Sequence, residues 1–128
     1  MKILGIGVDI IENKRIGNAI KNKRFIRRIF SNEEIFFSKN KKNKTLYFSK
    51  RFAAKEALAK AFGIGFRENI NFKDIKIVNN KLGKPNFVIT NKLKNIVKKK
   101  FKIKNFNFFL SISDEKNYSV AFVTLQKK

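Results

Sequence analysis

The stretch RFAAKEALAKAFGIG, residues 51–65, decides the fold because it predicts a long, tightly packed helix that ends at glycine. One face of this helix is apolar at helical spacing: Ala54, Leu58 and Ala61. Glu56 points to roughly the opposite side, where Phe52 and Lys60 are its neighbours. Desolvation there raises the pKa of a carboxyl group unless a cation compensates it. Two interpretations of Glu56 stay open, an i,i+4 salt bridge to Lys60 or a metal site.

The composition favours anionic partners. Lys and Arg number 31 against 9 Asp and Glu, so the formal net charge is +22. Lys, Asn, Ile and Phe together supply 73 of the 128 residues, and all four have codons made of A and T alone. Drift in an AT-rich genome is therefore an alternative to selection for a basic surface, and the two explanations stay open. A strongly positive field still accelerates association with phosphates and acidic proteins. The length predicts a single domain, residues 1–128.

The residues that are absent exclude several classes of chemistry. The chain has no Cys and no His, so Ser-His and Cys-His nucleophile pairs, the usual zinc sites and thiol redox centres are excluded. An apolar content of 43% without a long apolar run predicts a globular protein with no membrane span, and the N-terminus lacks a secretory signal pattern, so we expect a cytoplasmic protein. A hard cation has nine carboxylates to draw on: Asp9, Glu12, Glu33, Glu34, Glu56, Glu68, Asp74, Asp114 and Glu115.

The N-terminal residues 3–10 alternate as a strand does. Leu4, Ile6, Val8 and Ile10 fall on one face, whereas the other face carries Gly5, Gly7 and Asp9. Glycines in a strand allow a second backbone or a ligand to come close. Asp9 is the next residue on the face that Gly5 and Gly7 leave without side chains. The alternative is that Asp9 merely caps the next helix, with Glu12 three residues on as in a capping box.

The remaining pattern predicts an α+β domain, with helices packed against an antiparallel sheet. In the first half we expect a short helix near 16–20, an apolar and cationic segment at 24–30, a helix capped by Ser31 or Asn32, and a loop of merely solvated charge at 38–45. A helix from Ser49 to Gly63 follows, and then a hairpin of strands 72–78 and 86–89 with a turn through Asn79, Asn80 and Gly83. The last expected elements are a helix at 91–100 and strands 106–113 and 119–126. Strand 106–113 has little polar face, which indicates that both of its sides are covered, and another subunit is one candidate for the cover.

Four motifs, in this order and spacing, resemble the holo-[acyl-carrier-protein] synthases, the small bacterial 4′-phosphopantetheinyl transferases. They are GIGVDIIENKRI at 5–16, RFAAKEALAKAFGIG at 51–65, LGKP at 82–85 and SISDE at 111–115. The resemblance covers nearly the whole chain, and the central block is its most specific part. Many members of the family carry His where this chain has Asp114, so any role of that His is not transferred to Asp114.

The resemblance implies a Mg²⁺-dependent transfer, with Mn²⁺ as an alternative ion. The phosphopantetheine of coenzyme A passes to a serine of acyl carrier protein, and adenosine 3′,5′-bisphosphate is released. Asp9 and Glu56 would be the metal ligands, and Lys60 would lie near the pyrophosphate and neutralise or protonate the leaving group. The base would be Glu56 or Asp9 acting through a metal-bound water, or the hydroxide of that water.

The resemblance also implies two binding surfaces and a homotrimer with its sites between subunits. The expected coenzyme A contacts are Arg51, Lys60, Gly63, Gly65, Lys84 and Pro85. The expected contacts with the acidic carrier protein are Arg15, Arg24, Phe25 and Arg28. No nucleic acid or membrane partner is expected.

Two other functions compete with this one. A basic nucleic-acid-binding module would use Lys runs on phosphates and aromatic rings on bases, but most Phe residues lie at core periodicity and no nucleic-acid-binding motif is present. A degenerate, non-catalytic trimer is the other alternative, because of Asp114.

Overall fold

The computed structural model describes residues 2–63 and 70–128. Along the chain its elements are β1 (Lys2–Glu12), α1 (Asn13–Ala19), α2 (Lys23–Ile29), α3 (Asn32–Ser38), α4 (Lys44–Phe62), the 3₁₀ turn η1 (Phe72–Asp74), β2 (Ile77–Asn79), β3 (Pro85–Phe87), α5 (Asn91–Phe101), β4 (Phe106–Asp114) and β5 (Tyr118–Lys127). Within these residues, no helix combines the length and the hydropathy that a membrane-spanning segment requires.

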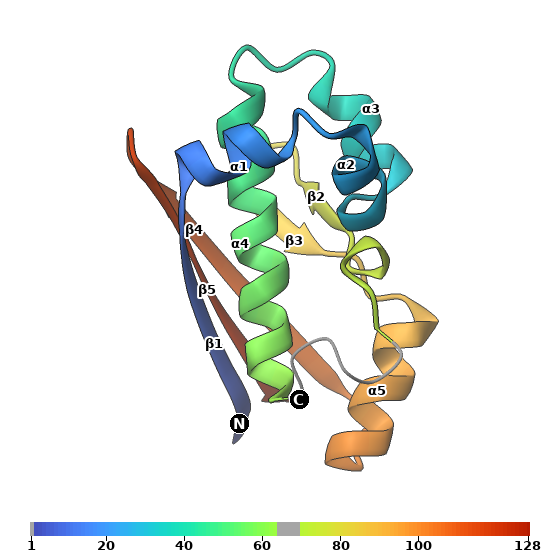
Figure 1. Ribbon diagram of the computed structural model, residues 1–128. Helices are drawn as coiled ribbons and strands as arrows, with labels where there is room; N and C mark the ends of the chain where they lie inside the picture. The colour runs from blue at the N-terminus through green and yellow to red at the C-terminus, as the bar shows by residue number, and fades with distance from the viewer. Residues whose placement is uncertain (1, 64–69) are drawn as a thin grey trace.

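The main sheet is antiparallel, with the strand order β1-β5-β4, and α4 lies along one of its faces (Figure 1). In the register of this sheet Asp9 of β1 is opposite Ala121 of β5, and Asp114 of β4 is opposite Ser119. A second, two-stranded sheet pairs Ile77 of β2 with Phe87 of β3. The architecture is therefore the expected α+β arrangement, and both predicted hairpins are confirmed.

Small residues let α4 approach the sheet closely. Its buried face is Ala53, Ala54, Ala57, Leu58 and Ala61, and the facing side of β5 buries Ala121, Val123 and Leu125. The helix ends at Gly63, whose φ of 74° lies in the left-handed region that glycine adopts most easily, as expected. The predicted start at Ser49 is wrong. The Asn43 side chain caps the helix by accepting a hydrogen bond from the Leu46 N–H at 2.9 Å, and Ser49 lies buried inside the helix.

The predicted hairpin is shorter than expected, and the predicted cap of α3 is confirmed. Residues 72–74 form a 3₁₀ turn rather than a strand, because the Asp74 carboxylate accepts a hydrogen bond from the Asn71 N–H at 3.1 Å and holds the chain in a turn. The two strands of the small hairpin are three residues each, shorter than expected. The Ser31 cap is confirmed: its hydroxyl accepts from the Glu34 N–H, and the Glu34 carboxylate accepts from the Ser31 N–H.

The face of the sheet opposite α4 is apolar and open in the single chain. Its large side chains are between 45% and 64% exposed: Ile6, Val8, Ile10, Phe109 and Phe122. They come from all three strands, so they form one continuous surface. Contiguous exposed apolar surface of this kind is typical of an interface between proteins.

Candidate active site

The glycines of β1 bring this strand against the backbone of α4. A Cβ atom built on Gly7 would lie 1.8 Å from the carbonyl oxygen of Ala57, and one built on Gly5 would lie 2.0 Å from that of Ala61. The bare face of the strand therefore accommodates the helix backbone, not a ligand. Because side chains alternate along a strand, Asp9 leaves β1 on this same α4-facing side, just beyond the contact.

Asp9 is held by a lysine from α4. The Lys60 ammonium donates to Asp9 Oδ1 at 3.1 Å and to the carbonyl oxygen of Val8 at 3.1 Å. The Asp9 side chain is 14% exposed, whereas that of Lys60 is 53% exposed and accessible to a ligand. The interpretation of Asp9 as a helix cap is wrong, because α1 begins after Glu12, three residues further on.

Glu56 lies in the same electrostatic cluster. Burial raises the pKa of the Glu56 carboxyl, and the negative charge of Asp9 raises it further, while the charges of Lys60 and Arg15 lower it. The i,i+4 salt bridge is not what the structure shows for Lys60, whose ammonium lies on Asp9 instead. Two carboxylates that are 47 positions apart in the sequence thus lie close enough for their charges to interact, and the charges of Lys60 and Arg15 act on the same site.

These two carboxylates fit a hard divalent cation that takes its remaining ligands from a substrate and from water. Asp9 and Glu56 offer carboxylate oxygens, and their mutual repulsion would be relieved by a cation between them. Among the described residues no group of three or more acidic, His or Cys side chains is positioned to enclose an ion. Mg²⁺ typically takes one or two protein carboxylates, and substrate phosphates and water complete its octahedral shell.

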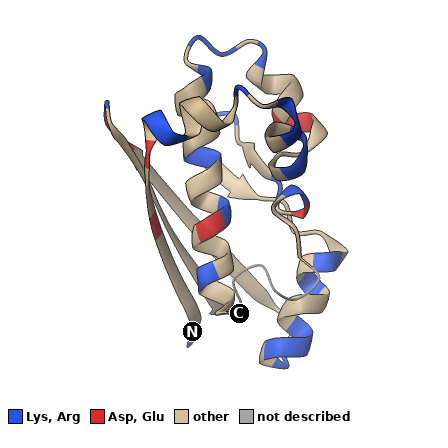
Figure 2. Cartoon of the chain, in the orientation of Figure 1, with Lys and Arg blue, Asp and Glu red and all other residues tan. Residues whose placement is uncertain are grey.

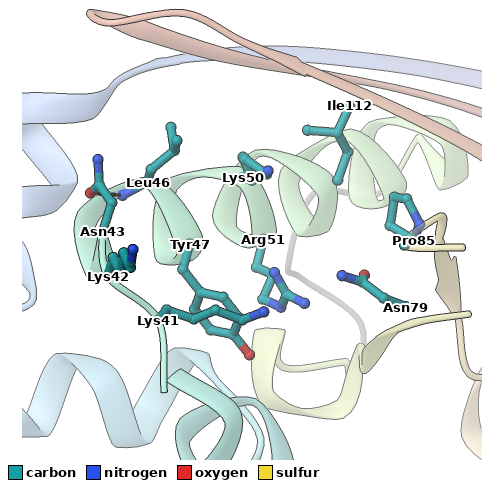
Figure 3. Close-up of a pocket in the computed structure, with 11 residues that line it drawn as sticks. Lys41, Lys42, Asn43, Leu46, Tyr47, Lys50, Arg51, Asn79, Pro85 and Ile112 are labelled. Carbon is teal, nitrogen blue, oxygen red and sulfur yellow. Dashed lines mark hydrogen bonds between the residues drawn. The ribbon is translucent and has the colours of Figure 1, made fainter. Parts of the chain in front are cut away.

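A pocket of about 300 Å³ opens beside the first half of α4 (Figure 3). Its wall includes the predicted contacts Arg51 and Pro85, together with Tyr47 and Asn79. The Arg51 guanidinium lies 3.8 Å from the centre of the Tyr47 ring. The structure therefore brings two predicted coenzyme A contacts together in a basic, partly aromatic pocket.

Three lysines of this pocket were missed by the sequence analysis: Lys41, Lys42 and Lys50. The first two lie in the segment 38–45 that was interpreted as a loop of merely solvated charge, and this interpretation is incomplete. Lys50 also pairs with Asp114 at 3.6 Å, which places the residue that departs from the family pattern next to the pocket. A basic segment directly before a helix that carries Arg51 is the signal that could have identified them.

The other predicted coenzyme A contacts are distributed differently. Lys84 stands between the pocket residues Gly83 and Pro85, in a turn fixed by its N–H donating to the Asn80 side chain at 2.9 Å. Gly63 lies at the far end of α4, twelve residues from Arg51, which corresponds to about 18 Å along a helix. Gly63 is therefore not part of this pocket. Gly65 lies outside the described residues.

One of the predicted carrier contacts, Arg15, acts on the Glu56 carboxyl, and the others lie on α2. Arg15, Arg24 and Arg28 are exposed on α1 and α2, where cations are dense (Figure 2). Phe25 packs against Phe52 with a ring-to-ring distance of 6.2 Å, and Phe52 lies one helical turn before Glu56. α2 is thus connected to the Glu56 side of α4 through two aromatic rings.

Comparisons with known proteins show the family to which the chain belongs. Residues 5–123 match the family model of the 4′-phosphopantetheinyl transferase superfamily. A holo-[acyl-carrier-protein] synthase of Pelagibacter ubique is 67% identical over 128 residues, covering all of both chains. One from Ehrlichia chaffeensis is 48% identical over 128 residues, covering 96% of each chain.

Two solved structures have the same fold over nearly the whole chain. The holo-[acyl-carrier-protein] synthase of Neisseria meningitidis is 38% identical with a TM-score of 0.88, covering 98% of this chain and 100% of that one. That of Bacillus anthracis, a complex with CoA (3′,5′-ADP), is 34% identical with a TM-score of 0.82, covering 98% of each chain. The chain belongs to the holo-[acyl-carrier-protein] synthases, within the 4′-phosphopantetheinyl transferase superfamily.

Proposed function

We propose that this chain, as one transferase domain, moves 4′-phosphopantetheine from coenzyme A to a serine of apo-acyl carrier protein in a Mg²⁺-dependent reaction in the cytoplasm. The reaction would supply carrier protein for fatty acid biosynthesis. The observation that carries the proposal is the meeting of Asp9, Glu56 and Lys60 where β1 crosses α4. Relatives with this activity in their names, up to 67% identical, support it.

The transfer is a phosphoryl transfer, so positioning and charge stabilisation supply most of the catalysis. The serine oxygen forms a bond to the β-phosphorus of coenzyme A, and the bond from that phosphorus to the bridging oxygen breaks. The bridging oxygen leaves with adenosine 3′,5′-bisphosphate. Mg²⁺, when held by Asp9 and Glu56, would neutralise the charge of the pyrophosphate, and Mn²⁺ offers similar chemistry.

The side chains of the cluster then take complementary roles. The exposed Lys60 ammonium, already fixed by Asp9 and the Val8 carbonyl, stabilises the negative charge that develops on the leaving phosphate. The proton of the serine hydroxyl would pass to Glu56 or Asp9 through a water, or to the hydroxide formed from that water.

The pocket beside α4 is the proposed site for the nucleotide end of coenzyme A. Arg51, Lys41, Lys42 and Lys50 supply positive charge for phosphate, and Tyr47 supplies an aromatic surface nearby. Lys84 and Pro85 remain proposed contacts from the neighbouring turn. Gly63 and Gly65 remain separate proposals, because the first lies at the other end of α4 and the second lies outside the described residues.

The apolar outer face of the main sheet supports a homotrimer in which the sites lie between subunits. Ile6, Val8 and Ile10 of β1 are more than half exposed, and they continue into Phe109 and Phe122 on the neighbouring strands. Burying this face against other copies removes the apolar surface from water. The carrier protein would approach from the side of Arg15, Arg24, Phe25 and Arg28.

The proposed function is tested by incubating the chain with coenzyme A, Mg²⁺ and apo-acyl carrier protein, and by following the carrier with mass spectrometry. The expected result is a mass gain of one phosphopantetheine on the carrier, which is absent after chelation of the metal. The Glu56→Gln variant, near-isosteric but uncharged, is expected to lose the activity. A carrier protein that stays unmodified with the folded wild-type chain would reject the proposal.

A further inference from the structure

A buried ionic cluster joins α3 to α4 behind the pocket. Its centre is Glu34, which is 2% exposed. Oε1 of Glu34 accepts a hydrogen bond from the Ser31 N–H at 2.9 Å and from the Lys55 ammonium at 2.7 Å. The Tyr47 hydroxyl donates to the backbone carbonyl of Glu34 at 2.8 Å. Glu34 therefore contacts both the cap of its own helix and two side chains of α4.

The second oxygen of Glu34 faces Arg51. Among the described residues neither Oε2 of Glu34 nor Nε of Arg51 has a hydrogen-bond partner, and the two atoms are 4.0 Å apart. A buried carboxylate oxygen without a hydrogen bond is costly, so Oε2 is expected to attract a cation other than the lysine already bound by Oε1. Arg51 is the cation that faces Oε2, and it is itself only 7% exposed.

Arg51 has room to adopt another orientation. It lies in the wall shared by the nucleotide pocket and a second hollow of about 290 Å³, which Glu34 and Ile77 line. The Tyr47 ring supports the Arg51 guanidinium on one side (Figure 3). The Tyr47 hydroxyl is held by the backbone carbonyl of Glu34, while the Glu34 carboxylate faces Arg51 itself.

We propose that Glu34 is a positioning residue that holds the Arg51 guanidinium toward the nucleotide pocket, and that it thereby sets the selectivity for the phosphate on the ribose of coenzyme A. This inference rests on the proposed function. The pyrophosphate is assigned to the cluster of Asp9, Glu56 and Lys60, so the phosphate left for Arg51 is the 3′-phosphate. Arg binds phosphate well only when its planar donors are correctly oriented.

Replacing Glu34 alone is a poor test, because a buried lysine would then lose its carboxylate partner. Lys55 is fully buried, and its ammonium donates to Glu34 Oε1 and to the carbonyl oxygens of Phe72 at 2.9 Å and Ile75 at 2.5 Å. Breaking a buried ion pair by deleting one partner is strongly destabilising, whereas replacing both partners with residues of similar shape is tolerated better. Lys55→Met removes one partner as well, but Glu34 then still has the Ser31 N–H at Oε1 and Arg51 beside Oε2. The informative comparison is therefore Lys55→Met with the double variant Glu34→Gln/Lys55→Met.

Both variants lack the Lys55 charge, and they differ in the carboxylate that faces Arg51. The assay measures kcat and KM with coenzyme A and with 3′-dephospho-coenzyme A, using apo-acyl carrier protein as acceptor. The wild type and Lys55→Met are expected to prefer coenzyme A. In the double variant the preference, expressed as the ratio of kcat/KM for the two substrates, is expected to fall roughly tenfold. The fall should come from a higher KM for coenzyme A, with kcat changed by less than about threefold. Arg51→Ala should lose the preference too, and adding the double substitution to it should change little more.

The outcomes separate the two proposals. If the double variant is folded by circular dichroism and keeps the wild-type preference, the role of Glu34 is rejected while the proposed function stands. If the wild-type chain modifies no carrier protein, the proposed function itself fails. Should the double variant not fold, Glu34→Asp shortens the carboxylate by one methylene and keeps its charge. A lowered preference in Glu34→Asp supports the inference, and an unchanged preference rejects it.

Discussion

Replacing Gly7 with alanine is expected to separate β1 from α4 and to displace Asp9 from the site. The added Cβ would lie 1.8 Å from the Ala57 carbonyl oxygen and 2.8 Å from the Ala61 nitrogen, both backbone atoms. Carbon and carbonyl oxygen approach no closer than roughly 3.3 Å, so the two backbones must move apart by about 1.5 Å. A side-chain rotation cannot relieve this clash, because the obstructing atoms belong to the helix backbone.

Overpacking of this kind costs about 3 kcal/mol or more, which corresponds to a loss of roughly 12 °C in Tm for a domain of this size. A displacement of about 1 Å at a catalytic group can cost roughly a hundredfold in rate, so kcat should fall by that order even at a temperature where the variant is folded. Scanning calorimetry and the carrier-modification assay measure the two effects.

The matched control is Gly17→Ala in α1. There the added Cβ meets the side chain of Thr45 at 3.2 Å, and a side chain can yield by a few tenths of an ångström. Alanine also favours the helix by roughly 0.5–1 kcal/mol over glycine. The control should therefore stay within about 1 kcal/mol of the wild type and keep its activity. A Gly7→Ala variant that matches the wild type in Tm and kcat would refute the packing argument.

Three further predictions follow from the same cluster and surfaces. The pKa of Glu56 is raised in the folded, metal-free protein, so Glu56 contributes stability below about pH 4.5, and this contribution is lost as the pH rises through the raised pKa. Without divalent ions Glu56→Gln should therefore have a larger free energy of unfolding than the wild type at pH 7, measured with denaturant. The difference should disappear near pH 4, and a less stable variant at pH 7 would contradict the prediction. Arg28→Glu should raise the KM for carrier protein roughly tenfold and leave the KM for coenzyme A unchanged, whereas Lys99→Glu, an equal charge change at an exposed position of α5, should do neither. Val8→Lys should give folded monomers at micromolar concentration by sedimentation; a trimer in this variant would refute the assignment of the interface to the outer face of the sheet.

Local sequence signals predicted much of the fold. The hairpin of β4 and β5 follows from two apolar strands around a polar turn, and the end of α4 follows from Gly63. The start of α4 was missed because Asn43 and Ser49 are both good caps, and the choice between them depends on tertiary packing that buries Ser49. The turn at residues 72–74 depends on the Asp74 carboxylate, a contact that periodicity does not report.

The site was only partly accessible from the sequence. The motifs that carry the family resemblance identified Asp9, Glu56 and Lys60, and the structure brings these three together. The close packing of Gly7 on α4 needs three-dimensional information, because the glycines could equally have admitted a ligand. The buried ion pair of Glu34 and Lys55 was not predicted. A single sequence does not show that two charged residues 21 positions apart are buried together.

The central claim is that Asp9 and Glu56 share one divalent ion, and metal binding tests it most directly. Mn²⁺ is titrated into the protein in the presence of coenzyme A by isothermal calorimetry, for the wild type and for Asp9→Asn, Glu56→Gln and the double variant. One strongly bound ion per chain is expected in the wild type, with marked weakening in each single variant and no strong site in the double variant. A double variant that binds Mn²⁺ as tightly as the wild type, with the same stoichiometry, would contradict the claim.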